Sequence, residues 1–428
     1  MNMQSYSMKL LHTSDWHLGQ SLGQYERSYE HTQFLTWLLD TLETEKIDAL
    51  VIAGDLFDNT NPSAASQAQL YQFLTQARKR VPHLGIVMTA GNHDSPGRME
   101  APSPFLSLLD AHVVGQVGRV VDGIDWNRIV VPLKNREGHV SAWCIAMPFL
   151  RPSDVPRLEG ADDTYMAGIG ILYASAYAHA LTKREPGQPI IALGHCHITG
   201  GKISGDSERP IVIGGSEALS VNVFDPGIAY VALGHLHLAQ KVGGDPTRRY
   251  CGSPLPMSFS EIDYPHQVVV IEFDGESVTN TREILIPRSV ELMRVPRQAA
   301  PLSKVMEQLQ AMVLEDLPES QWPYLQVRVQ LTQPEPGLRT QIESALTGKP
   351  VRLVRIETTA AQAGEGQVAP LISIDELSTQ DPASYFERLY KHRFNESPPT
   401  DIMAAFNELV NTAAEDRAQT GTDVGASA

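Results

Sequence analysis

The first hundred residues alternate between short apolar runs and longer amphipathic stretches. Continuous apolar runs of four or five residues are typical of strands buried on both faces of a parallel sheet. Two such runs occur here, residues 49–53 and 84–88, and residues 8–11 read as a short strand with one charged residue, Lys9. After residues 8–11, Phe34, Leu38 and Leu42 recur four residues apart, which predicts a helix with one apolar face.

A helix-start signal lies between the apolar runs 49–53 and 84–88. Asn61 is a favourable N-cap residue, and Pro62 suits the first helical position after it. We expect this helix to continue to about Arg80. The first hundred residues therefore have the order strand, helix, strand, helix, strand, which is typical of α/β folds.

From about residue 113 to 285 the pattern becomes rich in strands separated by short turns. Two apolar runs in this stretch, residues 189–193 and 229–233, have the composition of buried strands. We expect a second sheet here, packed on the first. The predicted fold class is α/β, a two-sheet β-sandwich flanked by helices, and residues 1–285 are expected to form one domain.

The pattern changes again near Pro287. Strand, helix, strand, helix and strand are predicted in turn over residues 289–295, 303–314, 324–331, 337–346 and 351–358. Residues 286–360 are therefore expected to form a small α+β capping domain.

A linker and a helical docking segment are expected over residues 361–412, because Gly, Gln and Ala dominate the first part. Its helices carry large side chains that look exposed: Tyr385, Phe386, Leu389, Tyr390 and Phe394. Such a stripe suits docking into the groove of a partner, and the alternative is packing on its own domain. The small, polar residues 413–428 are expected to be a disordered tail.

Composition limits what this 428-residue chain can be. Hydrophobic residues make up 42% of it, but no apolar run approaches the roughly 18 residues that span a bilayer. The polar start lacks the apolar block of a secretion signal, and three scattered cysteines favour neither disulfides nor a zinc–thiolate site. We expect a cytoplasmic protein with no membrane partner. The net charge of −16 argues against a broad basic surface, although a partner subunit could carry a basic groove.

Five short segments carry the residues that indicate chemistry, and each follows an apolar run. They are Asp15-Trp16-His17, Gly54-Asp55-Leu56-Phe57-Asp58, Gly91-Asn92-His93-Asp94, Gly194-His195 and Gly234-His235-Leu236-His237. Sites in open α/β sheets form beyond the carboxyl ends of the strands, so these segments are expected to converge. Their carboxylate, carboxamide and imidazole groups suit two divalent cations. The sequence therefore predicts a two-metal phosphoesterase site.

The seven expected metal ligands are Asp15, His17, Asp55, Asn92, His195, His235 and His237. Side chains two residues apart can point the same way, so Asp15 and His17 can hold one cation together. Asp55 is the expected bridge, since a carboxylate has one oxygen for each cation. His93 is expected to stabilise the transition state and to protonate the leaving oxygen. Mixed oxygen and imidazole donors fit Mn²⁺ or Fe²⁺, and Mn²⁺ is preferred.

Several neighbouring residues leave alternatives open. Asp58 and Asp94 are expected to accept hydrogen bonds from histidine rings and so fix their tautomers. His197 mimics the later G-H-x-H pattern, so it competes with His195 as a ligand, and His195 is preferred. Cys196 is interpreted as a buried filler, with a soft metal ligand as the alternative. Four histidines outside the motifs are interpreted as structural: His12, His31, His83 and His112.

The five segments match the pattern D-x-H, G-D-x-x-D, G-N-H-[DE], G-H and G-H-x-H in full, so the chain resembles the calcineurin-like metallophosphoesterases. Within them it is similar to the SbcD-type DNA nucleases over roughly residues 8–260, with further matches at residues 11–20, 148–152 and 250–254. The resemblance implies that His93 is catalytic and that two cations have separate ligand sets. These sets are Asp15, His17, Asp55 and His237 for one cation, and Asp55, Asn92, His195 and His235 for the other.

The resemblance also implies partners and substrates. They are DNA, cut at double-stranded ends, at hairpins and in single strands, and an ABC-type coiled-coil ATPase, SbcC, which stimulates the cutting with ATP. A homodimer within a heterotetramer is implied as well. The chain has no G-x-x-x-x-G-K-[ST] phosphate loop, so any ATP dependence must come from another polypeptide.

Two other functions remain open from the sequence. One is a stand-alone metallophosphoesterase that acts on nucleotides or phosphoproteins, and the other is a non-catalytic scaffold for an ATPase. The residues that would contact DNA are not decided by the pattern. Basic candidates are Arg98, Arg151, Lys202, Arg248 and Arg249.

Overall fold

The chain divides into two units. The computed structural model describes residues 7–121, 123–156, 164–203, 218–333 and 335–360, together with scattered positions between 386 and 406. One unit comprises Met1–Leu292 with Pro318–Trp322, and the other comprises Met293–Leu317 with Pro323–Ala428. Most of the predicted segment 361–412 and all of the predicted tail 413–428 lie outside the described residues.

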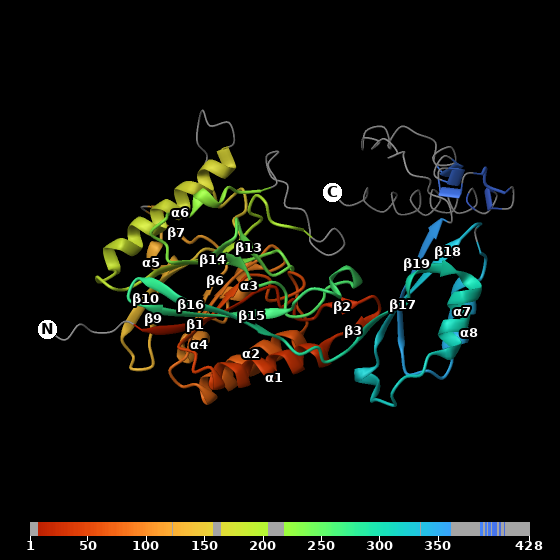
Figure 1. Cartoon of the computed structure of the whole chain (residues 1–428). Coiled ribbons are helices and arrows are strands. Elements are labelled where there is room, and N and C mark those ends of the chain that lie inside the picture. Colours follow the sequence, from red (N-terminus) through yellow and green to blue (C-terminus); the bar gives the residue numbers. More distant parts are fainter. Residues whose placement is uncertain are drawn as a thin grey trace, which may run out of the picture. The chain divides into compact units, whose positions relative to one another are not determined.

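The strands predicted near the N-terminus lie in one six-stranded sheet of order β16-β15-β1-β4-β5-β6. The three predicted strands are β1 (Met8–Thr13), β4 (Ala49–Ala53) and β5 (Gly85–Thr89). The sheet also contains β6 (Ala111–Val114), β15 (Gln267–Asp274) and β16 (Ser277–Leu285). β1, β4, β5 and β6 are parallel, so their carboxyl ends share one edge. The two predicted helices, α1 (Ser28–Thr44) and α2 (Ala64–Arg80), lie together on one side of this sheet (Figure 1).

A second six-stranded sheet, of order β13-β14-β12-β11-β10-β9, packs on the first as predicted. Its strands are β9 (Val130–Lys134), β10 (Val140–Ala146), β11 (Ile190–His195), β12 (Tyr230–Gly234), β13 (Gln240–Val242) and β14 (Asp245–Tyr250). The strand-rich pattern did not predict the long helix α6 (Thr164–Lys183), which packs on β9 and β10. Its buried residues recur mostly at helical spacing: Gly168, Ile169, Leu172, Tyr173, Ala176 and Ala180.

The central strand β4 shows why its sequence is apolar throughout. Leu50 and Ile52 pack in a core with α1 and α2. Val51, which points the other way, packs in a second core between the two sheets. Successive side chains of a strand alternate between faces, so a strand covered on both faces needs apolar residues at every position.

Smaller elements complete the first unit. They are β2 (Ser21–Leu22), β3 (Tyr25–Glu26), α3 (Pro96–Glu100), α4 (Ser103–Leu106), β7 (Arg119–Val120), β8 (Gly123–Ile124), α5 (Trp126–Ile129) and the 3₁₀ turns η1 (Ser107–Leu109), η2 (Val221–Val223), η3 (Phe259–Glu261) and η4 (Glu319–Gln321). Within the described residues, no helix combines the length and the apolar character needed to cross a bilayer.

The start of α2 differs from the prediction. Ser63, not Asn61, is the N-cap: its backbone is extended, and its Oγ accepts the Ser66 N–H at 3.1 Å. Asn61 instead uses its own backbone N–H to bond the Asn59 side chain at 3.0 Å. Pro62 therefore precedes the helix rather than opening it, and the serine takes the cap because its hydroxyl can reach the first turn.

Replacing the true cap should be the more costly change. We expect Ser63→Ala to lower the free energy of unfolding by about 1 kcal/mol, because an N–H of the first turn loses its partner. The matched control Asn61→Ala should change it by less than about 0.5 kcal/mol. Urea denaturation of the two variants checks this, and a larger loss for Asn61→Ala would restore the original assignment.

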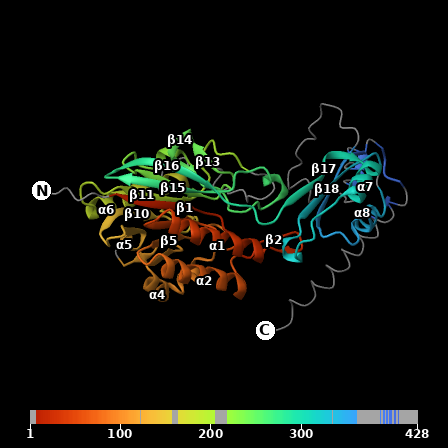
Figure 2. The ribbon, with the colours of Figure 1, turned by 60° about the horizontal axis from the view of Figure 1, so that its bottom comes forward.

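The second unit has the predicted order of elements. It contains β17 (Leu292–Pro301), α7 (Leu302–Ala311), β18 (Tyr324–Leu331), α8 (Leu338–Leu346) and β19 (Arg352–Ala360). The strands form one sheet of order β17-β18-β19, in which β18 and β19 are parallel. α7 and α8 lie together against this sheet (Figure 2). Val305 of α7, Val327 of β18 and Ile342 of α8 pack together in one small core.

The aromatic residues near the C-terminus pack on one another. The rings of Phe386 and Phe406 stack at 4.1 Å, and those of Tyr390 and Phe394 lie 4.8 Å apart. Tyr390 is only 7% exposed, so the expectation that it belongs to an exposed stripe is wrong. Tyr385 and Leu389 lie outside the described residues.

Candidate metal centre

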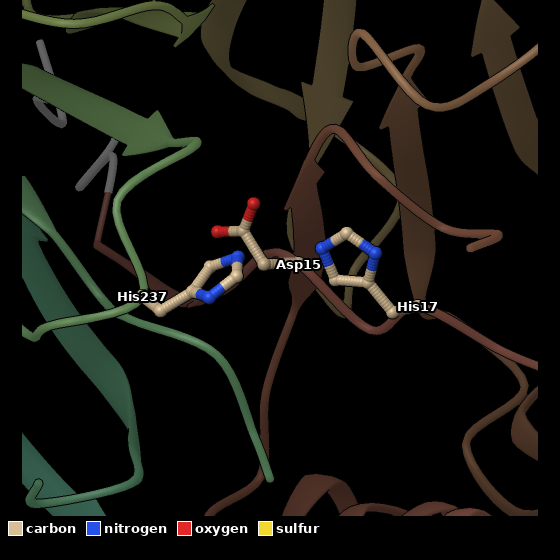
Figure 3. Close-up of side chains that lie close together, drawn as sticks. All are labelled: Asp15, His17 and His237. Atoms are coloured by element: carbon tan, nitrogen blue, oxygen red, sulfur yellow. The ribbon is translucent and has the colours of Figure 1, made fainter. Parts of the chain in front are cut away.

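All five motifs lie just past the carboxyl ends of strands from both sheets. β1 leads to Asp15 and His17, and β4 leads to Asp55. β5 leads to Asn92 and His93. The second sheet adds residues from β11, which ends at His195, and from β12, which leads to His235 and His237. In Figure 3, His237 approaches Asp15 and His17 from a second loop.

The backbone at these loops is strained. Asp15, His17, Asp55 and His235 have φ angles of 54°, 46°, 49° and 98°, in the left-handed region that non-glycine residues rarely adopt. Hydrogen bonds between loops hold them there, from Asp15 N to Gly54 O and from His17 N to Asp55 O, both at 3.0 Å. Strain of this kind persists only where the surroundings enforce it, and it gathers at functional sites.

Two motif glycines permit close approach. A Cβ on Gly54 would lie 2.1 Å from His195 Nδ1, and one on Gly91 would lie 2.0 Å from Asp55 Oδ1. Real contacts are never this short, so any side chain at either position would displace a predicted ligand. Glycine at these two positions therefore allows His195 and Asp55 to lie close to the backbone.

Asp55 lies at the middle of the cluster. Its Oδ2 is 3.3 Å from His195 Nε2 and 3.6 Å from His17 Nε2. Its Oδ1 accepts the His93 backbone N–H at 2.9 Å. One carboxylate therefore faces histidines from both sheets, the geometry that a bridging ligand requires.

Three groups of possible metal donors lie at or beside this carboxylate among the described residues, and one of them is His17, Asp58 and His93. Asp15, His17 and His237 offer ligand atoms within 4.8 Å of one another, and so do Asp15, Asp55 and His195. The rings of His17 and His237 lie 5.3 Å apart. The two groups that share Asp15 are compatible with a pair of cations.

Asn92 and His235 complete the set. Asn92 Oδ1 lies 3.0 Å from His195 Nε2. His235 donates its backbone N–H to Asp15 Oδ1 at 3.0 Å, and its ring lies 5.4 Å from that of His195. The structure therefore brings all seven predicted ligands together.

The positions of His195 and His197 favour His195 as the ligand. His195 Nδ1 donates to the Ala53 carbonyl at 2.9 Å, which leaves Nε2 for the site. His197 Nε2 lies instead 3.4 Å from the Gly201 carbonyl, and His197 belongs to none of the donor groups found among the described residues. Cys196 is also absent from those groups, and burial raises the pKa of its thiol to about 12, which fits a filler.

The residues present fit divalent cations. Both ring nitrogens of His17 are buried, and neither has a hydrogen-bond partner in the described part of the chain. Such orphaned nitrogens are costly unless something binds them. The donors are carboxylate oxygens, an amide oxygen and imidazoles, the set that suits Mn²⁺, Fe²⁺ and similar ions.

Charge pairing governs the central groups. Burial alone would raise the pKa of the Asp55 carboxyl, but the charge of His195 and its hydrogen bond outweigh burial and hold that pKa well below its usual range. Burial alone would lower the pKa of His195, but the Asp55 carboxylate raises it to about 9. For Asp15, burial dominates and raises the pKa.

His93 is placed for proton transfer. Its Nδ1 donates to the Asp58 backbone carbonyl at 2.7 Å, so Nε2 is the nitrogen that can exchange a proton with substrate. Its ring lies 4.8 Å from that of His17. The Asp58 carboxylate is 3.5 Å from His17 Nδ1, close to where a tautomer-fixing acceptor is expected.

The structure corrects the role expected for Asp94. Its buried carboxylate accepts the backbone N–H groups of Gly91 at 2.9 Å, Phe57 at 3.0 Å and Leu56 at 3.1 Å. Burial, with the charge of Asp55 next, raises the pKa of Asp94 to about 6 against these bonds. Asp94 therefore ties the β4 loop to the β5 loop rather than orienting a histidine ring.

Glu261 is a residue of the site that none of the five motifs indicated. This residue of η3 is fully buried, and its Oε1 lies 2.9 Å from His237 Nδ1. Its Oε2 accepts the Met257 N–H at 2.7 Å. A carboxylate behind a ligand histidine fixes the ring and raises its basicity. The available signal was an acidic residue directly after the Ser258-Phe259-Ser260 stretch.

Removing this carboxylate should weaken cation binding. We expect Glu261→Gln to lower the affinity for Mn²⁺ by about 10- to 100-fold, because the His237 ring loses a charged acceptor. Isothermal titration with Mn²⁺ measures the change. Glu283→Gln is the matched control, since Glu283 pairs with Arg249 at 2.6 Å and belongs to none of the donor groups. An equal loss in both variants would contradict a specific role.

The histidines interpreted as structural stay outside the site. His12 and His31 are buried, and burial lowers the pKa of each to about 3. His83 lies 3.8 Å from Asp48, and His112 is exposed on β6. No donor group among the described residues includes any of them.

Comparison with known protein families agrees with this geometry. Residues 8–239 match the calcineurin-like phosphoesterase family. Residues 288–394 match the family described as the type 5 capsule protein repressor C-terminal domain, SbcD_C. The first match covers all five motifs and ends before β13, so it contains only part of each sheet.

Named relatives show to which group of calcineurin-like phosphoesterases the chain is similar. The SbcD subunit of the SbcCD nuclease from Rhodobacter capsulatus is 38% identical over 369 residues, which cover 85% of this chain and 90% of that protein. The chain belongs to the SbcD family of calcineurin-like phosphoesterases. SbcD proteins of the same name from Escherichia coli K12 and Bacillus subtilis 168 are 30% and 32% identical, covering 95% and 75% of this chain and 99% and 79% of theirs.

The predicted family and fold class are therefore confirmed. As an SbcD-family phosphoesterase with a buried His/Asp cluster compatible with two cations, the chain is a metal-dependent hydrolase.

Proposed function

We propose that this chain is the nuclease component of an SbcCD-type complex and that it hydrolyses phosphodiester bonds of DNA. The observation that carries the proposal is the convergence of seven oxygen and imidazole donors around Asp55 in a chain whose relatives are named as nuclease components. Double-stranded ends, hairpins and single strands are the proposed substrates.

The ligand sets follow from neighbouring side chains. One cation would be held by Asp15, His17, Asp55 and His237, and the other by Asp55, Asn92, His195 and His235. Support for the first set comes from the mutual approach of Asp15, His17 and His237. Support for the second comes from the contacts of His195 Nε2 with Asp55 and Asn92. Mn²⁺ is the proposed ion, because it accepts this donor mixture and leaves coordination positions open.

Asp55, Asn92 and His93 have different proposed roles in hydrolysis. Bound divalent cations supply Lewis acidity, lower the pKa of the attacking water and stabilise charge on the leaving oxygen. Asp55 belongs to both ligand sets and so fixes their relative positions. Asn92 adds a neutral oxygen ligand, so it does not repel the negatively charged phosphate. His93, oriented by the Asp58 carbonyl, gives the proton on Nε2 to the leaving oxygen.

The proposed partner is an SbcC-like ABC-type ATPase, in a heterotetramer with two copies of this chain. Residues 286–360 are proposed as a capping domain and residues 361–412 as the linker and docking segment. The chain lacks a phosphate loop, which supports a separate source of ATP hydrolysis. Three free cysteines fit the proposed cytoplasmic location.

DNA cutting by the full chain tests the function. With Mn²⁺ the protein should cut linear duplex DNA, and EDTA should abolish the cutting. Hydrolysis of small phosphomonoesters with no cutting of DNA would favour a stand-alone phosphoesterase instead. Absence of any hydrolysis despite bound Mn²⁺ would favour a scaffold. Co-purification with the ATPase should be lost when residues 372–412 are deleted, and its retention would overturn the docking assignment.

A further inference from the structure

Arg151 lies beside the loop that carries His93. Its Nη2 donates to the backbone carbonyl of Asp94 at 3.2 Å. Its guanidinium carbon lies 5.4 Å from the centre of the Phe149 ring. The segment is fixed to the β5 loop, because Phe149 N donates to the Ala90 carbonyl at 2.8 Å.

This guanidinium differs from most others in its unit. Arg27, Arg128 and Arg249, for example, each form an ion pair with a glutamate. Arg151 has no ion pair with a carboxylate in the described part of the chain. Its Nη1 is buried and has no hydrogen-bond partner there either. A half-buried cation with an unused donor is costly unless an anion completes its surroundings.

The neighbours of Arg151 place that anion near the metal centre. The Phe149 ring, on which the guanidinium lies, meets the His195 ring edge-on at 6.3 Å. Asp94, whose carbonyl Arg151 bonds, directly follows His93 in the chain. The guanidinium therefore flanks the loop of the catalytic histidine without belonging to the cation ligands.

We propose that Arg151 binds a phosphate adjacent to the scissile one on the cut DNA strand. Arginine suits this task, since its planar fork gives charge-assisted bonds to phosphate oxygens. The bond from Nη2 to the Asp94 carbonyl fixes the guanidinium beside the His93 loop, and the side chain stays partly exposed, so a phosphate can approach it. This inference deepens the proposed nuclease function and rests on it.

The other basic candidates either have hydrogen-bond or ion-pair partners or do not contact the His93 loop among the described residues. Arg248 donates to the Ile228 carbonyl at 2.6 Å and to Thr247 Oγ1 at 2.8 Å. Arg249 is paired with Glu283. Arg98 and Lys202 have no described side-chain contact with the His93 loop. Arg151 is therefore the strongest of the five.

The test measures the activity of the full chain with Mn²⁺ on two substrates. For Arg151→Gln we expect kcat/KM on a blunt duplex oligonucleotide to fall about tenfold more than kcat/KM on bis(p-nitrophenyl) phosphate, which has no adjacent phosphate. The salt dependence of duplex binding, measured in a His93→Gln background, should lose about one unit of slope in log Kobs against log salt. Arg151→Lys, which keeps the charge, should restore the slope.

Arg136→Gln is the matched control. Arg136 pairs with Asp48 at 3.4 Å, at the end of β4 opposite to the site, and this variant should keep both activities and the slope. Equal losses on the two substrates with an unchanged slope would mean that Arg151 only positions the His93 loop, and no loss at all would also overturn the proposal. If the wild-type chain hydrolyses the small diester but never cuts DNA, the nuclease function itself fails.

Discussion

His93→Gln is expected to lower the rate of DNA hydrolysis by about 10²- to 10⁴-fold while leaving both cations bound. His93 contributes only its backbone N–H to Asp55, at 2.9 Å, and this bond survives the substitution. Its imidazole is held by the Asp58 carbonyl for proton transfer, and glutamine cannot give up a proton to a leaving oxygen. Cleavage assays with Mn²⁺ and a metal titration of the same preparation measure the two effects separately.

A second histidine provides the control. His112 is exposed on β6, in the same sheet, and contacts none of the donor groups. His112→Gln should leave both cutting and metal stoichiometry unchanged. Loss of a cation from His93→Gln would show that this ring is a ligand, and retention of full activity would remove it from the reaction.

Asp55→Asn should have the largest effect on the metal centre as a whole. The Asp55 carboxylate faces His195 at 3.3 Å and His17 at 3.6 Å, so its charge acts on both ligand sets. Asparagine keeps the shape but offers a neutral group whose NH₂ cannot bind a cation. We expect weaker binding of both cations and a fall in activity of at least about 10³-fold, which corresponds to several kcal/mol of lost transition-state stabilisation.

Asp48→Asn is the matched control, because Asp48 is also buried and lies just before β4, at the other end of the strand. Its carboxylate accepts the Lys9 N–H at 2.8 Å. This variant should lower stability without changing metal stoichiometry. If Asp55→Asn loses only one cation in titration, the carboxylate does not bridge.

Local pattern was sufficient for much of the fold. The run 49–53 coincides with β4, because a strand buried on both faces must be apolar at almost every position. Residues 324–331 coincide with β18, where Val327 and Val329 alternate with polar residues, as in a strand with one buried face. The same reasoning failed for α6. Its 20 residues are apolar or small with a single charged residue, Lys183, so the buried face hardly contrasts with the exposed one.

The pairing of β1 with β15 could not be predicted from the sequence either. β15 and β16 extend the first sheet, although they follow the whole second sheet in the chain. Their pairing depends on contacts between residues such as Leu10 and Ile271, far apart in sequence. The pairing of these strands depends on packing between residues far apart in the sequence, so a short stretch of sequence cannot predict it.

The sequence by itself determined the ligand types and their place at strand ends, because spacing within each motif and apolar character before it are local properties. Only the tertiary structure favoured His195 over His197, placed Glu261 behind His237, and showed that the Asp94 carboxylate accepts backbone N–H groups instead of facing a histidine ring. Each of these depends on which donor lies within about 3 Å of which acceptor. Such distances are fixed when segments over a hundred residues apart meet across two sheets, as His195 and Ala53 do.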